Sequence, residues 1–244
     1  MTESRDSNSK NYRKFQIDIS DYIILNQIES GGFGLVYAVQ NTKTKLNFAA
    51  KVLNTHNDES QYKKMINREI GIMIRCQHPT IIKFIGFSFE DFNHQKNVTI
   101  FMDLAKKGSL AELLSKSQNG LLDEIVDNTI KQIILVGIAR GMMILHQHHI
   151  IHRDLKPGNI LLDKEYHPLI TDFGLSKFYE TGRSMIQSQQ CGTSMYMAPE
   201  IIEGNRYNGK VDVYSFGILM YEVVTNSIPY PSLYNGKMTP FSFH

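Results

Sequence analysis

Apolar residues recur in one part of the chain with the period of β-strands. Residues 22–30 alternate apolar and polar side chains, and a strand resumes at residues 35–39 after a turn containing Gly31, Gly32 and Gly34. Three further strands are predicted, at residues 48–53, 81–89 and 98–103, of which the first is apolar apart from Lys51.

Other segments have the spacing of helices. Apolar side chains recur every three to four positions in residues 60–76. Ser109 is expected to open a short helix as an N-cap, with Glu112 three residues later as the second half of a capping box. A long amphipathic helix is predicted over residues 130–145. Residues 210–225 are apolar on nearly all faces, which is typical of a helix at the centre of a domain.

The side chains that best suit catalysis lie around a predicted hairpin of residues 160–162 and 168–171. A hairpin of this kind places Asn159 and Asp172 side by side. Two oxygen-bearing side chains so placed can hold a hard divalent cation on a nucleotide phosphate. Asp154 lies in the loop that also contains Asn159, within reach of a substrate hydroxyl.

Composition narrows the class of protein. The 244 residues are 42% hydrophobic, and the net charge of +2 argues against nucleic acid or an acidic membrane as the main partner. The two cysteines, Cys76 and Cys191, imply no disulfide framework, so a reducing, cytoplasmic compartment fits best. Residues 1–20 predict a disordered tail without a secretory signal. Residues 130–145 are too short and too charged to span a bilayer.

Three motifs, in this order along the chain, resemble those of eukaryotic protein kinases. His152-Arg153-Asp154-Leu155 resembles the family's catalytic loop. Asp172-Phe173-Gly174 resembles its metal-binding motif, and Ala198-Pro199-Glu200 resembles the end of its activation segment. The resemblance implies an α+β fold with two lobes. Residues 21–104 would form a small antiparallel sheet with one helix, and residues 105–244 a larger, mainly helical lobe. It also implies ATP as the nucleotide, with Mg²⁺, or Mn²⁺ in its place, as the cation.

The resemblance further implies the chemistry, which is transfer of the γ-phosphoryl group of ATP to a protein Ser or Thr in signalling. Asp154, Lys156 and Asn159 would be catalytic, with Asp154 orienting the substrate hydroxyl and accepting its proton. Asn159 and Asp172 would be the metal ligands. Lys156 and Thr193 match the serine/threonine form of the family, in which this threonine bonds the catalytic Asp and Lys.

Nucleotide binding is expected to involve a Lys51–Glu69 ion pair. Lys51 ends an apolar strand and needs a partner, because an unpaired buried charge is costly, and Glu69 lies on the inner face of the predicted 60–76 helix. The alternative is an ion pair that only supports the fold. By resemblance, residues 103–105 would meet the adenine edge. The implied contacts are Ile28, Gly31, Gly34, Val36, Ala49, Lys51, Glu69, Met102, Asp103, Ala105, Leu161 and Asp172.

Residues of the second half suggest a kinase group and a mode of regulation. Asp212 is expected to anchor the backbone of the catalytic loop, and residues 212–217 resemble the tyrosine-kinase-like group of serine/threonine kinases. Arg153 could pair with a phosphate and order the activation segment. The candidate phosphate acceptors are Thr181, Ser184, Ser188, Thr193 and Ser194.

Two departures from the family leave alternatives open. Glu29 stands where the family usually has a glycine. Only residues 226–244 follow the last predicted helix, so the large lobe is expected to be a fragment, to be covered by a partner or to be poorly stable. Both features favour a pseudokinase, a nucleotide-binding scaffold without turnover. The Ala198-Pro199-Glu200 motif disfavours a small-molecule kinase. Three nearby histidines also raise a metal hypothesis, although cations favour a helix C-terminus in any case. They are His146, His148 and His149.

Overall fold

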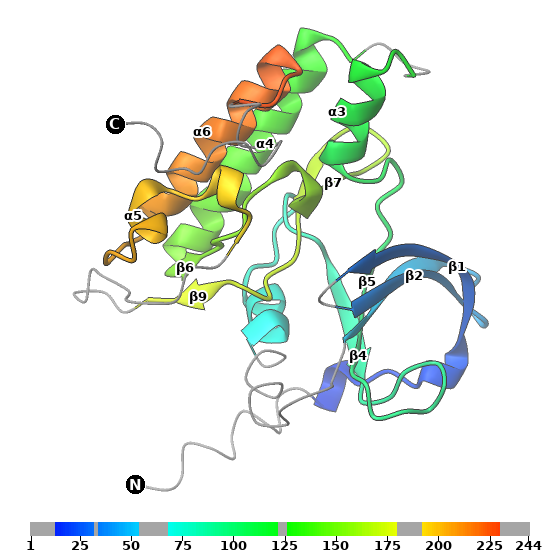
Figure 1. The fold of residues 1–244 in the computed structure, drawn as a ribbon. Coiled ribbons are helices and arrows are strands. Elements are labelled where there is room, and N and C mark those ends of the chain that lie inside the picture. The colour runs from blue at the N-terminus through cyan, green and yellow to red at the C-terminus, as the bar shows by residue number, and fades with distance from the viewer. Residues whose placement is uncertain (1–12, 32–33, 54–67, 122–125, 180–191, 230–244) are drawn as a thin grey trace, which may run out of the picture. The chain divides into compact units, whose positions relative to one another are not determined.

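The computed structural model describes residues 13–31, 34–53, 68–121, 126–179 and 192–229 (Figure 1). The chain divides into two compact units, Met1–Ile70 with Lys83–Leu104 and Gly71–Ile82 with Ala105–His244. Residues 71–82 were predicted to lie in the first lobe, but they fall in the second unit. The end of this segment is hydrogen-bonded to Ile170 of that unit: the Ile82 N–H donates to the Ile170 carbonyl, and the Ile170 N–H donates to the Thr80 carbonyl, both at 2.9 Å.

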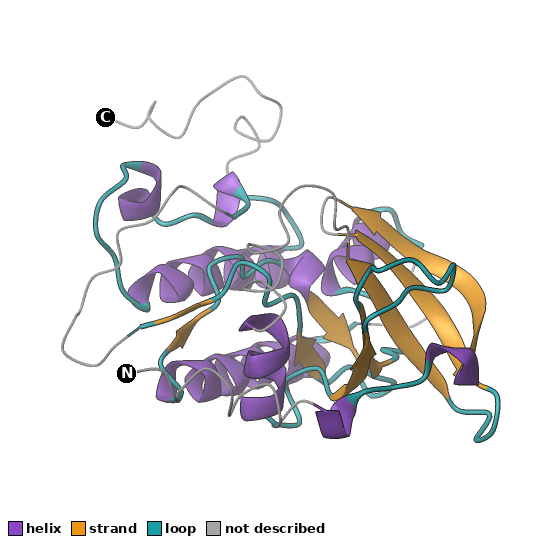
Figure 2. Ribbon diagram, turned by 90° about the horizontal axis from the view of Figure 1, so that it is seen from below, coloured by secondary structure: helices purple, strands orange, loops and turns teal. Residues whose placement is uncertain are grey.

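The first unit is built on a five-stranded sheet in the order β1-β2-β3-β5-β4. Figure 2 shows these strands as one curved layer. All the pairings are antiparallel, which confirms the predicted small antiparallel sheet. Its buried core includes Ile19, Val39, Ala50 and Phe101. The strands are β1 (Tyr22–Gly31), β2 (Gly34–Asn41), β3 (Asn47–Leu53), β4 (Phe84–Ser88) and β5 (Thr99–Asp103).

The segment before β1 corrects the prediction that residues 1–20 form a disordered tail. Within it, Arg13–Phe15 and Ile19–Asp21 are short 3-10 helices. The Ile17 N–H donates to the Phe87 carbonyl at 2.8 Å, and Ile19 is only 5% exposed. The polar composition concealed two isoleucines that pack on the sheet, so the ordered part of this unit begins before residue 21.

The second unit contains the helices α3 (Leu110–Gln118), α4 (Asn128–Gln147), α5 (Pro199–Ile202) and α6 (Lys210–Thr225). The predicted cap of α3 is confirmed, because the Ser109 side chain accepts the Glu112 N–H at 3.2 Å. Asp127 caps α4 in the same way through the Ile130 N–H at 2.9 Å. Short strands lie between the helices: β6 (Ile150–Ile151) pairs with β9 (Lys177–Phe178), and β7 (Ile160–Leu162) with β8 (Pro168–Ile170). The predicted hairpin is therefore present.

α4 is longer than the predicted 130–145 helix. By length and composition it meets the criteria for a membrane-crossing helix, which corrects the prediction that this segment is too short and too charged to span a bilayer. Within this unit, one side of α4 packs against β8, and 33% of its apolar window is buried. A Cβ atom at Gly137 would lie 2.4 Å from the Pro168 ring, and one at Gly141 would lie 2.6 Å from the Ile170 side chain. The two glycines allow β8 to approach this side of the helix closely.

α6 lies beside α4 (Figure 1) and has the bounds that the sequence predicts. Its side chains are apolar on most faces, but only part of the helix is buried in the described structure. The buried positions include Val211, Leu219 and Val223, whereas large apolar side chains at other positions are exposed. The exposed set is Val213, Tyr214, Met220, Tyr221 and Val224.

Candidate active site

The loop between β6 and β7 brings Asp154 and Asn159 together. The Asn159 amide nitrogen donates to the Asp154 carboxylate at 2.9 Å and to the Asp154 backbone carbonyl at 2.7 Å. A 3-10 turn at Pro157–Asn159 makes this approach possible, because it folds the chain back within the loop. Both side chains are nearly buried, so the loop presents a fixed carboxylate rather than a freely rotating one.

Lys156 and Thr193 complete the surroundings of Asp154. The Lys156 ammonium lies 3.0 Å from Asp154 Oδ2 and donates to the Thr193 hydroxyl at 2.8 Å. Thr193 in turn donates its backbone N–H and its hydroxyl to Asp154 Oδ1, at 2.9 and 3.0 Å. The expected contacts of this threonine with the Asp and the Lys are therefore confirmed.

The β7–β8 hairpin brings the predicted metal ligands to its open end. The Thr171 N–H donates to the Asn159 carbonyl at 3.0 Å, so the residue before Asp172 is paired with Asn159. Asp172 has a positive φ of 64°, a conformation that is uncommon for a residue with a side chain. The next residue, Phe173, is buried with its ring 5.5 Å from that of His152. These contacts fix the backbone on both sides of Asp172.

The donor atoms present suit a hard divalent cation. The amide nitrogen of Asn159 is used on Asp154, which leaves its amide oxygen as the available ligand. Asp172 supplies a carboxylate, and Mg²⁺ prefers oxygen ligands of these two kinds. The residues thus fit the cation that the sequence analysis expects.

Asp212 anchors the catalytic loop, as predicted. Its carboxylate accepts the backbone N–H groups of His152 and Arg153, both at 2.9 Å. Arg153 has a φ of 68°, which costs a residue with a Cβ atom free energy unless the surroundings hold it. A buried carboxylate on α6 therefore stabilises the strained residue directly before Asp154.

The expected nucleotide residues of the first unit share one face of its sheet. Val36 is directly opposite Lys51, and Ala49 is directly opposite Met102. Opposed residues of an antiparallel pair project to the same face, and so do residues two apart on one strand. These four side chains therefore form one surface. A further sheet candidate, Asp103, already uses its backbone N–H on the Lys83 carbonyl at 3.0 Å, so that N–H is not available to an adenine ring.

The predicted Lys51–Glu69 ion pair is present. Lys51 Nζ lies 2.9 Å from Glu69 Oε1, and both residues are buried. Residues 68–75 are helical, while the first half of the predicted 60–76 helix lies outside the described residues. The second carboxylate oxygen of Glu69 has no hydrogen-bond partner among the described residues.

The glycine-rich turn is described on its two sides. Gly34 has a φ of 138°, and a Cβ atom there would lie 2.0 Å from the Val52 carbonyl oxygen, so only glycine fits. Gly31 ends β1, and both Glu29 and Ile28 are exposed. Ile28 falls at an irregularity in the pairing of β1 with β2, so its face is not set by the register.

The other candidates lie in the second unit or outside the described residues. Ala105 and Leu161 are half-buried in the second unit. Arg153 donates to the Leu175 carbonyl at 2.6 Å, near the start of the activation segment, and to the Tyr207 hydroxyl at 3.1 Å, beyond its end. Burial raises the pKa of the Cys76 thiol to about 11. Thr181, Ser184, Ser188 and Cys191 lie outside the described residues.

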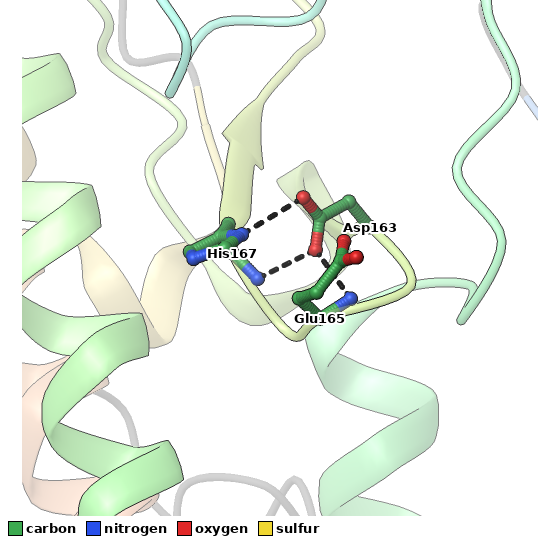
Figure 3. Close-up of side chains that lie close together, drawn as sticks. All are labelled: Asp163, Glu165 and His167. Carbon is green, nitrogen blue, oxygen red and sulfur yellow. Dashed lines mark hydrogen bonds and ion pairs between the residues drawn. The ribbon is translucent and has the colours of Figure 1, made fainter.

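The turn of the β7–β8 hairpin brings together a second group of side chains that could hold a metal ion (Figure 3). Atoms of Asp163, Glu165 and His167 lie within 4.8 Å of one another. The Asp163 carboxylate accepts the backbone N–H groups of Glu165 and His167 at 2.8 Å, and it lies 3.0 Å from the His167 ring. These bonds close the hairpin, and the side chains of Glu165 and His167 are exposed, so the cluster is explained by the turn itself.

Two contacts in the second unit have no counterpart in the sequence analysis. His146 lies 2.8 Å from Asp212, whereas the sequence suggested for this histidine only a metal site. Tyr196 donates to the Glu222 carboxylate at 2.6 Å. The sequence held one signal for these contacts: Asp212 and Glu222 lie within the mostly apolar α6. A buried carboxylate on such a helix requires a hydrogen-bond donor.

The five-stranded antiparallel sheet and the helical unit define a two-lobed α+β fold. The chain belongs to the protein kinase family, whose protein kinase domain model matches residues 22–240.

The chain is similar to several curated proteins. It is 34% identical over 216 residues to Mitogen-activated protein kinase kinase 1 of Arabidopsis thaliana, and the match covers 88% of this chain and 58% of that protein. The identity is 33% over 231 residues to cAMP-dependent protein kinase type 3 of Saccharomyces cerevisiae, covering 94% and 53%. Serine/threonine-protein kinase AtPK1/AtPK6 of A. thaliana is 33% identical over 216 residues, covering 88% and 44%. The chain thus spans about half the length of these relatives. The family implies ATP, a divalent cation and protein substrates.

Proposed function

We propose that this chain is an active serine/threonine kinase that transfers the γ-phosphoryl group of ATP to protein Ser or Thr hydroxyls. The observation that carries the proposal is the surroundings of Asp154. Its carboxylate is held by Asn159, Lys156 and Thr193 at hydrogen-bond distances, in a loop anchored by Asp212. These contacts hold the carboxylate in one direction, as a proton acceptor in phosphoryl transfer requires.

The residues of the site have separate tasks in this mechanism. Asp154 orients the substrate hydroxyl and takes its proton, and Lys156, already 3.0 Å away, neutralises negative charge beside it. Lys51 holds the nucleotide phosphates and is itself held by Glu69. Asn159 and Asp172 would hold Mg²⁺ or Mn²⁺, which when bound neutralises the phosphate oxygens. Catalysis then consists of placement and charge stabilisation, with little covalent chemistry for the protein.

Specificity for Ser and Thr is supported by the contact between Lys156 and Thr193. This lysine and threonine are the pair by which the sequence resembles serine/threonine kinases, and the structure places them 2.8 Å apart. Membership of the tyrosine-kinase-like group is supported by the sequence of residues 212–217, at the start of α6. A cytoplasmic location is supported by Cys76, a buried thiol without a disulfide partner.

The test is release of ADP from Mg-ATP with a generic protein substrate, compared with an Asp154→Asn control. We expect turnover by the wild-type chain and a loss of at least about a hundredfold in the control, because the proton acceptor is removed. Both proteins should be stabilised thermally by Mg-ATP. Equal rates would reject catalysis, and thermal stabilisation without turnover would instead support the pseudokinase alternative, in which the exposed Glu29 weakens phosphate binding.

A further inference from the structure

The first unit carries a groove that the proposed mechanism does not use. Residues 16–19, which precede β1, form one of its walls, and residues 88–90, at the end of β4, form the other. These two segments lie side by side in the fold (Figure 1). The groove has a volume of about 500 Å³, which is in the range of sites that bind small ligands. Both walls belong to the same compact unit.

The walls of the groove are held in place by the backbone. The Ile17 N–H donates to the Phe87 carbonyl at 2.8 Å, which joins the segment before β1 to the edge of β4. Beyond this bond Asp18 caps the short 3-10 helix Ile19–Asp21, so the chain no longer follows the strand. In the loop after β4, the Asp91 carboxylate accepts two backbone N–H groups at 2.8 and 3.0 Å. Walls that are fixed in advance lower the entropic cost of binding a ligand.

One wall of the groove presents an aromatic ring. Phe89 is 57% exposed, although its ring packs against that of Phe87 in a T-shaped pair with centroids 5.1 Å apart. Phe87 itself is buried at 4% exposure. The buried ring holds the exposed one, so Phe89 offers a positioned aromatic face to which a cation can bind.

Two carboxylates line the same groove. Asp18 Oδ1 accepts the N–H and the hydroxyl of Ser20 at 3.0 and 2.7 Å, while its Oδ2 accepts no hydrogen bond among the described residues. Glu90 Oε2 lies 3.2 Å from the His94 ring, and Glu90 Oε1 is likewise unpaired within the described part of the chain. The hydrogen bonds from Ser20 lower the pKa of Asp18, and His94 adds to this effect. One imidazole is therefore within electrostatic reach of both carboxylates.

We propose that this groove is a docking site for an arginine side chain in an extended segment of a partner protein. An aromatic face beside two carboxylates suits a guanidinium, which can stack on Phe89 while its N–H groups donate to Asp18 and Glu90. The neighbouring cation Lys43 does not replace it, because its ammonium is bound by Asp21 at 2.7 Å. The proposal goes beyond the kinase activity and does not depend on it.

Charge favours a partner over the first residues of this chain as the occupant. Residues 1–12 adjoin the groove in sequence, but they carry Glu3 and Asp6 as well as Arg5 and Lys10. Such a segment brings as much negative as positive charge to a groove lined by two carboxylates. A partner segment with an arginine between apolar residues complements both the carboxylates and the apolar side chain of Ile17.

The test titrates short peptides into the full chain labelled with nitrogen-15. The probe is acetyl-Leu-Arg-Leu-amide, and its matched control has citrulline in place of arginine, which keeps the shape of the side chain and removes its charge. We expect the arginine peptide to shift the amide signals of residues 17–18 and 88–90, with a Kd of about 1 mM or below. The citrulline peptide should bind at least about tenfold more weakly. Equal affinities, or shifts confined to other residues, would overturn the proposal.

Variants of the groove test the individual contacts. Asp18→Asn keeps the cap, because the Asn oxygen can still accept the Ser20 N–H, but it removes the charge. Asp18→Asn and Glu90→Gln should each weaken the arginine peptide at least about fivefold, and Phe89→Leu about threefold or more. Glu165→Gln is the matched control, since it removes an exposed carboxylate of the second unit and should change nothing. Unchanged affinity in both carboxylate variants would overturn the proposal, with melting temperatures as the check on folding.

A deletion decides between the two occupants. A chain that begins at Arg13 should bind the arginine peptide within about twofold of the full chain, because residues 1–12 do not compete for the groove. Peptide binding that appears only after this deletion would overturn the assignment to a partner and give the groove to residues 1–12. Amide shifts report binding without turnover, so a chain without ADP release would overturn the kinase proposal and leave this test intact.

Discussion

Thr193 donates both its backbone N–H and its hydroxyl to the same oxygen of Asp154, at 2.9 and 3.0 Å. The two residues are 39 positions apart in the chain. The hydroxyl also accepts from Lys156, so one threonine links the proposed proton acceptor to the proposed cation of the site. Thr193 thereby couples the position of the activation segment to that of the catalytic loop.

Replacing the Thr193 hydroxyl should therefore slow transfer without unfolding the chain. We expect Thr193→Val to lower kcat by about tenfold or more, because Asp154 and Lys156 lose their common partner. Thr193→Ser, which keeps the hydroxyl, should remain within about threefold of wild type. Steady-state ADP release measures both variants, and melting temperatures check the fold. A Val variant as fast as wild type would show that the backbone N–H alone positions Asp154.

The Lys51–Glu69 pair should behave as a buried pair in which removing one partner is worse than removing both. Lys51→Met leaves the Glu69 carboxylate buried without the ammonium 2.9 Å away, and we expect a loss of about 3 kcal/mol in the free energy of unfolding. The double variant Lys51→Met/Glu69→Leu should recover most of that loss. Urea unfolding compares the three proteins. Additive losses would show that the two side chains are not coupled. Neither variant should respond thermally to Mg-ATP as wild type does.

Gly86 should be essential for the segment that precedes β1. A Cβ atom there would lie 2.4 Å from the Phe15 carbonyl oxygen and 2.6 Å from the Ile17 side chain. We expect Gly86→Ala to destabilise the protein by about 1–3 kcal/mol and to speed amide exchange at Ile17, whose N–H bonds Phe87. Gly217→Ala is the control, since nothing lies within 4 Å of its added Cβ and α6 should gain up to about 1 kcal/mol. Equal stability of the two variants would contradict the packing described for this segment.

Glu222 should make stability depend on pH. Burial raises its pKa above the usual 4.5, although the hydrogen bond from Tyr196 opposes this shift. Because the folded pKa is the higher one, the contribution is fully present below the unfolded pKa and is lost as pH rises through the folded pKa. Glu222→Gln, which cannot ionise, should therefore gain stability relative to wild type between pH values below 4.5 and neutral pH. Urea unfolding at both pH values tests this. A difference that is constant, or that shrinks as pH rises, would contradict the raised pKa.

Local patterns were sufficient for most elements of the fold. The bounds of α6 follow from its apolar run, the cap of α3 from Ser109, and the β7–β8 hairpin from two short apolar runs. These features depend on residues near in sequence, so spacing and capping chemistry determine them. The segment before β1 was wrongly predicted to be disordered because its local composition is polar. Ile17 and Ile19 are ordered by contacts with the sheet at the edge of β4, which is distant in sequence.

The amino-acid sequence by itself determined the kinase motifs and the residue types of the site, including Lys51, Asp154, Asn159 and Asp172. Only the tertiary structure decided which distant polar groups pair with each other in the second unit, such as His146 with Asp212 and Tyr196 with Glu222. The physical reason is that a buried polar group must find a donor or acceptor wherever the fold supplies one. That choice depends on which helices and loops meet, and no periodicity along the chain records it.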